Sequence, residues 1–343
     1  MAHGAGGLIM QDLISRIIVE NFKGSNAEVP LEALDDSAVI DDIVLKSDSH
    51  TVKPLFFPGG DIGRLSISGT VNDISVMGAK PLALTSSFII EEGFPMLDFE
   101  RIVKSMAGTC KEVGVHIITG DTKVMEKGAI EKLVVNTSGI GKRTGALDRN
   151  IEEIRRYRPF NVRWLLDSNL KKGDKIIVSG NIGDHGVAIL SSRAGYSFEN
   201  KIFSDVAPLT QLITSLLNVG GIVKMKDPTR GGLSNSLNEW SEKSDVGIMV
   251  YEDKIPIREG VRAACEMLGL DPLEIANEGK IVLAVLPQKA EQVLAALKKT
   301  RQGENAEIIG ETTQAFRGVV IETEIGGKRI LSPPIGDPIP RIC

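Results

Sequence analysis

The chain has 343 residues, of which 42% are hydrophobic and 25% charged, a composition typical of a globular protein with room for two domains of ordinary size. No apolar run approaches the roughly 20 residues of a membrane helix, and residues 1–10 have neither a basic start nor a long apolar stretch, so we expect a cytoplasmic protein without a membrane segment. The net charge of -5 is spread over interspersed residues of both signs, which argues against nucleic acid as a partner.

The first half of the chain predicts mixed α and β structure. Apolar residues at helical spacing predict helices over residues 65–77 and 98–113, and each is followed by a glycine. Short apolar runs predict strands over residues 43–46, 82–90, 115–119 and 133–137. The next stretch, residues 141–169, is polar, charged and weakly periodic, although a short helix over residues 151–157 fits its pattern. We therefore expect a domain boundary there.

A second region of mixed α and β structure begins at a Lys-Lys-Gly-Asp turn near residue 171. It predicts strands over residues 175–179, 281–286 and 319–322, and helices over residues 206–217, 233–241, 259–268 and 289–298. From residue 332 onward, four prolines exclude a helix and favour an extended arm. The predicted organisation is an N-terminal segment (residues 1–30), an N-terminal domain (31–145), a linker or insertion (146–170), a C-terminal domain (171–331) and a flexible tail (332–343).

The three cysteines are widely separated in the sequence and form no CxxC pair, so their spacing predicts neither a zinc site nor a redox pair. Cys110 and Cys265 fall on apolar faces of expected helices, where packing is the usual role. Cys343 is the last residue and stands at the end of the proline-rich arm, which could carry its thiol to a distant site. A chance surface cysteine is the alternative interpretation.

No Walker or Rossmann glycine motif is present, and the first half of the chain offers acidic residues beside turns instead. These residues are Asp35, Asp36, Asp48, Asp73 and Asp121. Carboxylates from several strand ends can converge on Mg2+, a hard cation that shares oxygen ligands with substrate phosphates. Asp121, expected just after a strand, is the strongest single candidate. Turn capping by Asp35 and Asp36, and a solvated helix charge at Asp73, are the alternatives.

Residues 57–81, together with the acidic motifs at residues 35–38 and 119–124, resemble the aminoimidazole ribonucleotide synthetase-like (PurM-like) superfamily. Its enzymes use ATP to phosphorylate an amide-like oxygen or a related nucleophile. The resemblance implies an α+β, two-domain PurM-like fold, in which the N-terminal domain contributes to a dimeric β-barrel and the C-terminal domain is also α+β. A homodimer is implied with it.

Within that superfamily, the motifs at residues 180–186, 227–233 and 276–280 and the terminal Pro-Arg-Ile-Cys resemble the carbamoyl dehydratase family of hydrogenase maturation proteins, over essentially the whole chain. The resemblance implies the reaction. The carbamoyltransferase HypF would place a carbamoyl group on the sulfur of Cys343, ATP would phosphorylate the amide oxygen, and loss of phosphate would leave a thiocyanate. The cyanide would then pass to iron in a HypC–HypD complex, for nickel–iron hydrogenase.

The resemblance also implies site residues. Those that match its magnesium- and ATP-binding acids are Asp36, Asp48, Asp73 and Asp121, with Asp35 as a weaker candidate. Arg230 would hold a phosphate at the start of a helix. Lys132 and Glu278 match positions near the carbamoyl group, where Lys132 would neutralise charge and Glu278 would accept a proton. His50 is either near the nucleotide or structural, and we leave it out of the catalytic set. We interpret His185 as a packed loop histidine, with a site residue as the alternative.

Two other functions stay open as alternatives. A small-molecule kinase of the same superfamily, of the thiamine phosphate or selenophosphate type, would share the acidic motifs, but it gives no reason for a terminal Pro-Arg-Ile-Cys. A nucleotide-binding carrier without catalysis would bind ATP and show no turnover even with a carbamoylated Cys343. The terminal cysteine, with Lys132 and Glu278, favours an enzyme.

Overall fold

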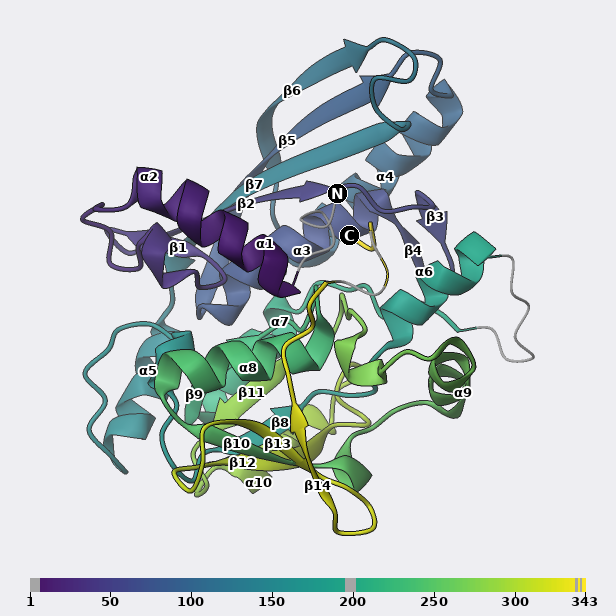
Figure 1. Ribbon diagram of the computed structural model, residues 1–343. Helices are drawn as coiled ribbons and strands as arrows, with labels where there is room; N and C mark the ends of the chain where they lie inside the picture. The colour runs from purple at the N-terminus through teal and green to yellow at the C-terminus, as the bar shows by residue number, and fades with distance from the viewer. Residues whose placement is uncertain (1–6, 195–201, 337–338, 340) are drawn as a thin grey trace.

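The computed structural model describes residues 7–194, 202–336, 339 and 341–343. In this structure two α+β domains lie one above the other, and the C-terminus returns to the boundary between them (Figure 1). Pro340, which belongs to the terminal Pro-Arg-Ile-Cys, lies outside the described residues. Within the described ranges, every helix is too short or too polar to cross a membrane.

The chain begins with a helical segment that contacts the C-terminal domain. Its parts are α1 (Gly7–Leu13), a π-helical turn (Ile14–Val19) and α2 (Glu20–Phe22). The Gln11 amide donates to the Glu239 carboxylate over 2.9 Å, and the Leu8 N–H donates to the Pro334 carbonyl over 3.2 Å. These bonds join the N-terminal helices to helix α8 (Gly232–Ser244) and to the start of the C-terminal arm.

The N-terminal domain is built on a five-stranded sheet with the strand order β1-β2-β7-β5-β6. Its strands are β1 (Ala38–Ile40), β2 (Ile43–His50), β5 (Ala79–Glu91), β6 (Ile117–Met125) and β7 (Leu133–Arg143). A hairpin of β3 (Phe56–Phe57) and β4 (Gly60–Asp61) precedes helix α3 (Ile62–Val76), and α4 (Met96–Val113) packs beside α3. The two helices predicted in this half are confirmed, with ends shifted by a few residues.

Helix α3 lies between this sheet and the C-terminal domain, so nearly all of its side chains are buried. Asp61 caps its first turn by accepting a main-chain N–H over 3.0 Å. The sheet approaches closely because Gly141 has no side chain: a Cβ there would lie 2.3 Å from Ile74 Cγ2. On the other side, the hydroxyls of Ser75 and Thr210 are 2.9 Å apart. Helix α3 therefore contacts both domains along its length.

Strand β6 is the exposed edge of the sheet, and here the structure corrects the prediction from sequence. The apolar pattern predicted a strand over residues 115–119 with Asp121 just after it, but β6 covers Ile117–Met125 and includes Asp121. Most residues of β6 are exposed on both faces, so the strand shows no alternation of buried and exposed positions. The five strands form an open sheet, and the described part of this single chain contains no closed barrel.

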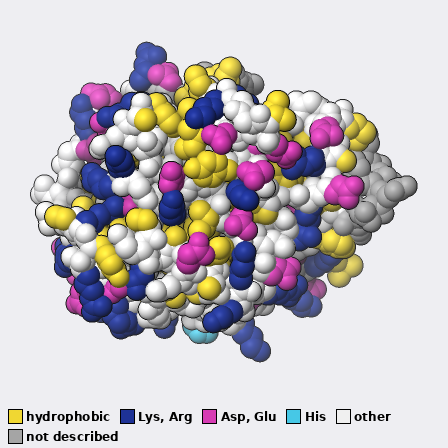
Figure 2. Space-filling view, turned by 90° about the horizontal axis from the view of Figure 1, so that it is seen from below, with side chains coloured by type: hydrophobic (Ala, Val, Ile, Leu, Met, Phe, Trp, Pro, Cys, Tyr) yellow, Lys and Arg dark blue, Asp and Glu magenta, His cyan; other side chains and the backbone are white. Residues whose placement is uncertain are grey.

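The C-terminal domain is built on a seven-stranded sheet with the strand order β14-β13-β10-β12-β8-β11-β9. Its strands are β8 (Lys175–Val178), β9 (Ile222–Lys226), β10 (Gly247–Tyr251), β11 (Val282–Val285), β12 (Glu307–Thr313), β13 (Gly318–Glu322) and β14 (Lys328–Leu331). The helices are α5 (Gly145–Arg155), α6 (Asp184–Ala194), α7 (Thr210–Val219), α8 (Gly232–Ser244), α9 (Glu259–Leu268) and α10 (Ala290–Leu297). Seen from below, acidic and basic side chains are interspersed on the outer face (Figure 2).

Residues 146–170, predicted as a linker or insertion, pack as part of the C-terminal domain. Helix α5 begins after Thr144, whose hydroxyl caps its first turn, and Ile154 lies in the buried core. The side-chain amide of Asn150 donates to the Ile222 carbonyl over 2.7 Å and accepts the N–H of the same residue over 2.8 Å. The sequence predicted a linker here because the charged residues on the outer face of α5 interrupt the apolar residues of its buried face.

The tail is held at both ends, although the sequence predicted a flexible arm. Next to α8, the Ser234 hydroxyl donates to the Ser332 carbonyl over 2.9 Å. The chain then returns to the N-terminal domain (Figure 1), where Ile339 and Ile342 are each 1% exposed. Prolines exclude regular structure in this segment, but the isoleucines between them provide apolar surface that can be buried.

Candidate active site

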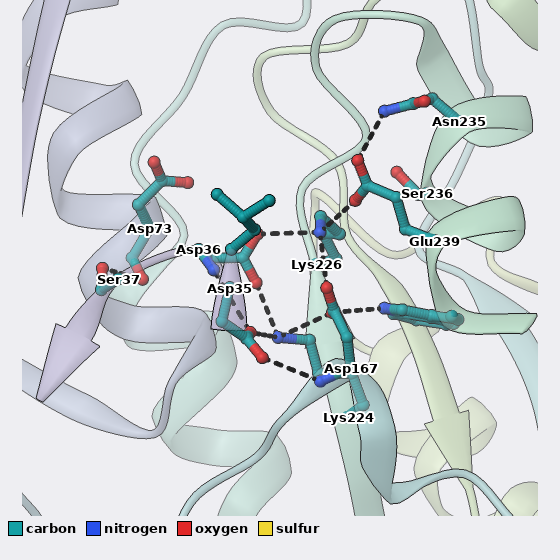
Figure 3. A network of polar contacts seen from close by, with 12 residues as sticks. Asp35, Asp36, Ser37, Asp73, Asp167, Lys224, Lys226, Asn235, Ser236 and Glu239 are labelled. Carbon is teal, nitrogen blue, oxygen red and sulfur yellow. Dashed lines mark hydrogen bonds and ion pairs between the residues drawn. The ribbon is translucent and has the colours of Figure 1, made fainter. Parts of the chain in front are cut away.

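A buried network of charges lies where the loop before β1 meets strand β9 of the C-terminal domain (Figure 3). The Nζ atom of Lys224 lies 2.5 Å from Asp35, 2.7 Å from Asp36 and 3.2 Å from Asp167. Lys226, on the same face of β9, lies 3.1 Å from Asp167 and 3.5 Å from Asp36. Two acids of the N-terminal domain are therefore held by cations of the C-terminal domain.

The lysines of this network keep two of its acids ionised. Burial raises the pKa of Asp36, but Lys224 and Lys226 outweigh it, so the net shift is downward. Burial also opposes ionisation of Asp167, yet Lys224, Lys226 and Lys243 hold its pKa well below the usual value. The Trp240 Nε1–H donates to the same carboxylate over 2.9 Å. Asp167 thus has a structural role, because it joins three lysines and Trp240 in one buried network.

A second acidic group lies beside the first and combines three separate elements. Asp36 comes from the loop before β1, Asp73 from α3 and Asp227 from the position after β9, and one carboxylate oxygen of each lies within 4.8 Å of the other two. Burial, with Asp73 and Asp36 nearby, raises the pKa of Asp227 well above its usual value. Burial and the neighbouring acids also raise the pKa of Asp73 to about 6, against the attraction of Lys46.

The chemistry of this second group suits a divalent cation. Three carboxylates so close together repel one another unless protons or a cation compensate their charge. The Oδ2 atom of Asp227 is buried and has no hydrogen-bond partner among the described residues. Asp48 lies next to the group, because the Lys46 ammonium is 3.3 Å from Asp48 and also pairs with Asp73. Oxygen ligands of this kind are those that Mg2+ prefers.

Glu278 is buried in the loop before β11, with 2% of its surface exposed. Asp205 holds this loop, since its two carboxylate oxygens accept the N–H groups of Glu278 and Gly279 over 3.1 and 3.2 Å. Burial, with Asp205 and Asp73 nearby, raises the pKa of Glu278 well above its usual value. Its Oε1 atom is buried and finds no hydrogen-bond partner in the part of the chain that the structure describes. A carboxyl with a raised pKa can exchange a proton near neutral pH.

Arg230 stands at the turn before α8, next to Gly231 and Gly232, whose positive φ angles of 74° and 59° favour glycine. Its positive charge opposes the rise in the pKa of Glu278. It also helps to lower the pKa of His50 to about 4, although burial is the larger cause there. Arg230 therefore lies near enough to the buried acids to act on them electrostatically.

Asp121 and Lys132 lie apart from these acids in the single chain. The Asp121 side chain in β6 is 62% exposed and lies 3.5 Å from Lys123, and neither acidic group found among the described residues includes it. Lys132 is exposed just before β7, where its N–H donates to the Glu91 carboxylate over 2.8 Å. The four predicted magnesium ligands are therefore not assembled as one set here, because β6 carries Asp121 at the open edge of the sheet.

The C-terminal arm brings Cys343 back to the N-terminal domain. Its carbonyl accepts the Thr51 N–H over 3.1 Å, and the residue is half-buried against an apolar cluster that includes α3 and α6 side chains. Arg341, two positions earlier, pairs with the Glu131 carboxylate. Glu131 is the neighbour of Lys132, so the arm ends in the same region of the N-terminal domain as that lysine.

The sequence analysis missed several residues of this site, which are Lys46, Asp205, Lys224, Lys226 and Asp227. Asp227 opens the Asp-Pro-Thr-Arg-Gly-Gly motif, which the sequence analysis interprets only through Arg230. Lys224 and Lys226 stand two positions apart in the apolar run Ile-Val-Lys-Met-Lys, and that spacing places both on one face of a strand. Two lysines on one face of an apolar strand are a signal that predicts buried acidic partners.

Comparisons with known proteins give the family of this chain. The family description "AIR synthase related protein, N-terminal domain" matches residues 34–142, and "AIR synthase related protein, C-terminal domain" matches residues 171–322. A protein of Methanocaldococcus jannaschii named for hydrogenase expression and formation is 53% identical, over 99% of this chain and 98% of its own length. The carbamoyl dehydratase HypE of Bradyrhizobium diazoefficiens is 43% identical, over 100% of this chain and 95% of its own length.

Solved structures lead to the same family. A HypE–HypF complex matches with a TM-score of 0.85 at 47% identity, over 94% of this chain and 99% of that chain. HypE in complex with ATP matches with a TM-score of 0.81 at 41% identity, over 99% and 98%. A thiamine monophosphate kinase of Aquifex aeolicus, with a TM-score of 0.60 at 16% identity over 94% and 96%, shares the fold. With such similarity over its whole length, this chain belongs to the AIR synthase related protein family and, within it, to the HypE carbamoyl dehydratases.

Proposed function

We propose that this protein uses ATP to remove water from a carbamoyl group carried on the sulfur of its own Cys343, which leaves a thiocyanate for hydrogenase maturation. The observation that carries the proposal is the position of Cys343, the last residue, whose main chain is bonded to Thr51 of the N-terminal domain. The full-length similarity to carbamoyl dehydratases supports it.

The reaction balances in two steps. The oxygen of the S-carbamoyl group attacks the γ-phosphorus of ATP, ADP leaves, and the nitrogen gives up one proton. The second N–H proton is then removed while the C–O bond breaks, and the oxygen departs with phosphate. The products are S–C≡N on the protein, ADP, phosphate and a proton. Phosphorylation is required because an unmodified amide oxygen is a poor leaving group.

The buried acid Glu278 suits the removal of these protons. Burial raises its pKa well above the usual value, which makes the carboxylate a stronger base, and Asp205 fixes its loop by accepting two main-chain N–H groups. We assign to Lys132 the neutralisation of developing negative charge on oxygen, and to Arg230 a contact with phosphate. The exposed side chain of Lys132 begins next to Glu131, which holds the arm.

We further propose that Mg2+ binds at Asp36, Asp73 and Asp227. Asp48 becomes a further ligand when its ion pair with Lys46 breaks. The unpartnered oxygen of Asp227 and the mutual repulsion of the three carboxylates support this set. When bound, Mg2+ would screen the negative charge of the nucleotide phosphates. Before Mg2+ binds, the ion pair with Lys224 of the C-terminal domain holds Asp36 in place.

A homodimer with a shared β-barrel is the proposed assembly. The open sheet supports it, because its strands expose large apolar side chains that a second copy would cover. These side chains are Leu45, Leu82, Ile117, Ile118, Val124 and Ile140. Asp121 lies on the same exposed edge, and we propose that it contributes to ATP and magnesium binding only in the dimer.

HypF is the proposed carbamoyl donor, and a solved HypE–HypF complex at 47% identity supports it. A HypC–HypD iron complex is the proposed acceptor of the cyanide, as the family resemblance implies. The cytoplasm is the proposed compartment of this protein.

The test is the intact mass of the protein after incubation with HypF, carbamoyl phosphate and ATP, with Cys343→Ala as the control. We expect a carbamoyl adduct that loses the mass of one water only when ATP is present, and no adduct on the variant. An unmodified Cys343 despite ATP turnover would favour a small-molecule kinase of the same superfamily. A carbamoyl adduct that persists with bound ATP would instead favour a carrier without catalysis.

A further inference from the structure

The end of the arm pairs with the N-terminal domain in the manner of a short antiparallel strand. The Thr51 N–H donates to the Cys343 carbonyl over 3.1 Å, and the Lys53 N–H donates to the Arg341 carbonyl over 3.2 Å. This alternation turns Ile342 toward the opposite side, as in any strand. Ile342 is 1% exposed and lies in an apolar cluster. The last residues are therefore docked, with Cys343 at the end of the pairing.

The opposite side of this pairing is fixed by His185, in the first turn of α6. Its Nε2 atom lies 2.9 Å from the carbonyl oxygen of Ile342, and its Nδ1 atom lies 2.7 Å from the hydroxyl of Ser204. The ring is fully buried and meets the ring of Phe57 edge-on, with centroids 5.5 Å apart. His185 is thus packed, as predicted, but it lies in a helix rather than a loop, and it contacts the arm one residue before Cys343.

The partners of His185 decide which ring nitrogen carries the hydrogen. A carbonyl oxygen can only accept, so Nε2 donates to Ile342, and Nδ1 then accepts the Ser204 hydroxyl. The Ser204 oxygen in turn accepts the Val206 N–H over 3.0 Å. In this chain of hydrogen bonds, from the Ile342 carbonyl to the Val206 N–H, every polar atom has a partner. Burial lowers the pKa of His185, which keeps the ring neutral and the series intact at neutral pH.

The segment that orients His185 also holds the proposed base. Asp205 follows Ser204 directly, and its carboxylate accepts two N–H groups of the Glu278 loop. Two positions further, the carbonyl of Ala207 accepts the side-chain amide of Asn72, in α3, over 3.1 Å. Residues 204–207 therefore connect the arm, the loop of the base and the helix that carries one of the acids.

We propose that His185 is a positioning residue for the reaction at Cys343. His185 holds the carbonyl of the residue before the cysteine and so limits where the sulfur can lie. Because Ser204 bonds His185 and the adjacent Asp205 bonds the Glu278 loop, the sulfur is held at a fixed position relative to Glu278. The inference rests on the proposed dehydration and extends it, because it names the contact that docks the arm. Loss of this hydrogen bond releases the arm and leaves nucleotide binding unchanged.

The docking contact is tested in the full-length protein by the rate at which iodoacetamide alkylates Cys343, followed by peptide mass spectrometry. His185→Leu removes the donor at similar bulk, His185→Gln retains an N–H donor, and Val187→Ala is a matched control at another buried position of the same helix. We expect His185→Leu to raise the alkylation rate ~5- to 100-fold, the factor for one buried hydrogen bond. His185→Gln and Val187→Ala should stay within about threefold of the wild type.

The positioning role is tested by dehydration of carbamoylated Cys343 at saturating ATP. His185→Leu should lower the rate at least ~10-fold with an unchanged KM for ATP, and His185→Gln should restore most of it. Equal alkylation of Cys343 in folded His185→Leu and Val187→Ala would overturn the docking contact. Faster alkylation with normal dehydration would overturn the positioning role. A wild type that dehydrates nothing would overturn the proposed function and the positioning role together, while alkylation would still decide the docking contact.

Discussion

The substitution Lys224→Met should be among the most destabilising in this chain. The lysine side chain is 0% exposed, and its Nζ lies 2.5, 2.7 and 3.2 Å from oxygens of Asp35, Asp36 and Asp167, which are 3%, 5% and 0% exposed. Methionine fills similar space without the charge, so three buried carboxylates would lose the cation that they share, and Lys226 and Lys243 would compensate only part of their charge. Breaking a buried ion pair by removing one partner costs about 3–5 kcal/mol.

Thermal unfolding measures this cost. In a domain of 150–250 residues each kcal/mol lowers Tm by about 2–4 °C, so the expected decrease is on the order of 6–20 °C. The matched control is Lys175→Met, which removes a lysine whose side chain is 34% exposed beside a 38% exposed Glu311. Partly exposed pairs of that kind contribute about 0–1 kcal/mol. A Tm for Lys224→Met as high as that of the control would refute the reasoning that this network is a framework of the fold.

Other outcomes follow from the site and the buried histidine. Glu278→Gln should leave ATP binding intact and slow dehydration ~10²- to 10⁴-fold, so full activity in a mass-spectrometric assay would remove Glu278 as the base. Asp227→Asn should abolish most of the Mg2+-dependent part of ATP affinity, and calorimetric titrations with and without Mg2+ that still differ as in the wild type would exclude Asp227 as a ligand. Because burial lowers the pKa of His50 to about 4 from 6.5, the unfolded chain takes up this proton first, and stability is lost as pH falls from 6.5 toward 4. Urea unfolding across that range should show a shallower loss in His50→Gln, and identical pH dependence would contradict the assignment.

The elements with a one-sided or fully apolar pattern were predictable from sequence. Helix α4 and strand β11 show their buried residues directly in the order of apolar side chains. Helix α6 was missed because it begins at Gly-Asp-His-Gly, where glycines indicate a turn rather than a helix. Strand β6 was placed too early because an exposed edge strand needs no apolar alternation.

The candidate site was only partly predictable for a related reason. Asp73 and Glu278 stand in motifs that a family resemblance can identify; Glu278 is buried and Asp73 is partly buried, and both have raised pKa values. The contribution of Asp205 depends on a loop that lies 73 positions away from Glu278 in the sequence. No local pattern encodes such a distant pairing. The separation of Asp121 from the other acids likewise follows from sheet topology, which spacing alone does not give.

The lysines that cross from one domain to the other restrict how this protein can move. Separating the two domains would break the ion pairs of Lys224 and Lys226 with Asp35 and Asp36. Buried charges in both domains would then have lost these partners. A hinge opening at that boundary is therefore too expensive to accompany each turnover. We expect the body to stay closed and the C-terminal arm to move instead, which breaks its main-chain hydrogen bonds, the His185 contact and the Arg341–Glu131 ion pair and exposes Ile342.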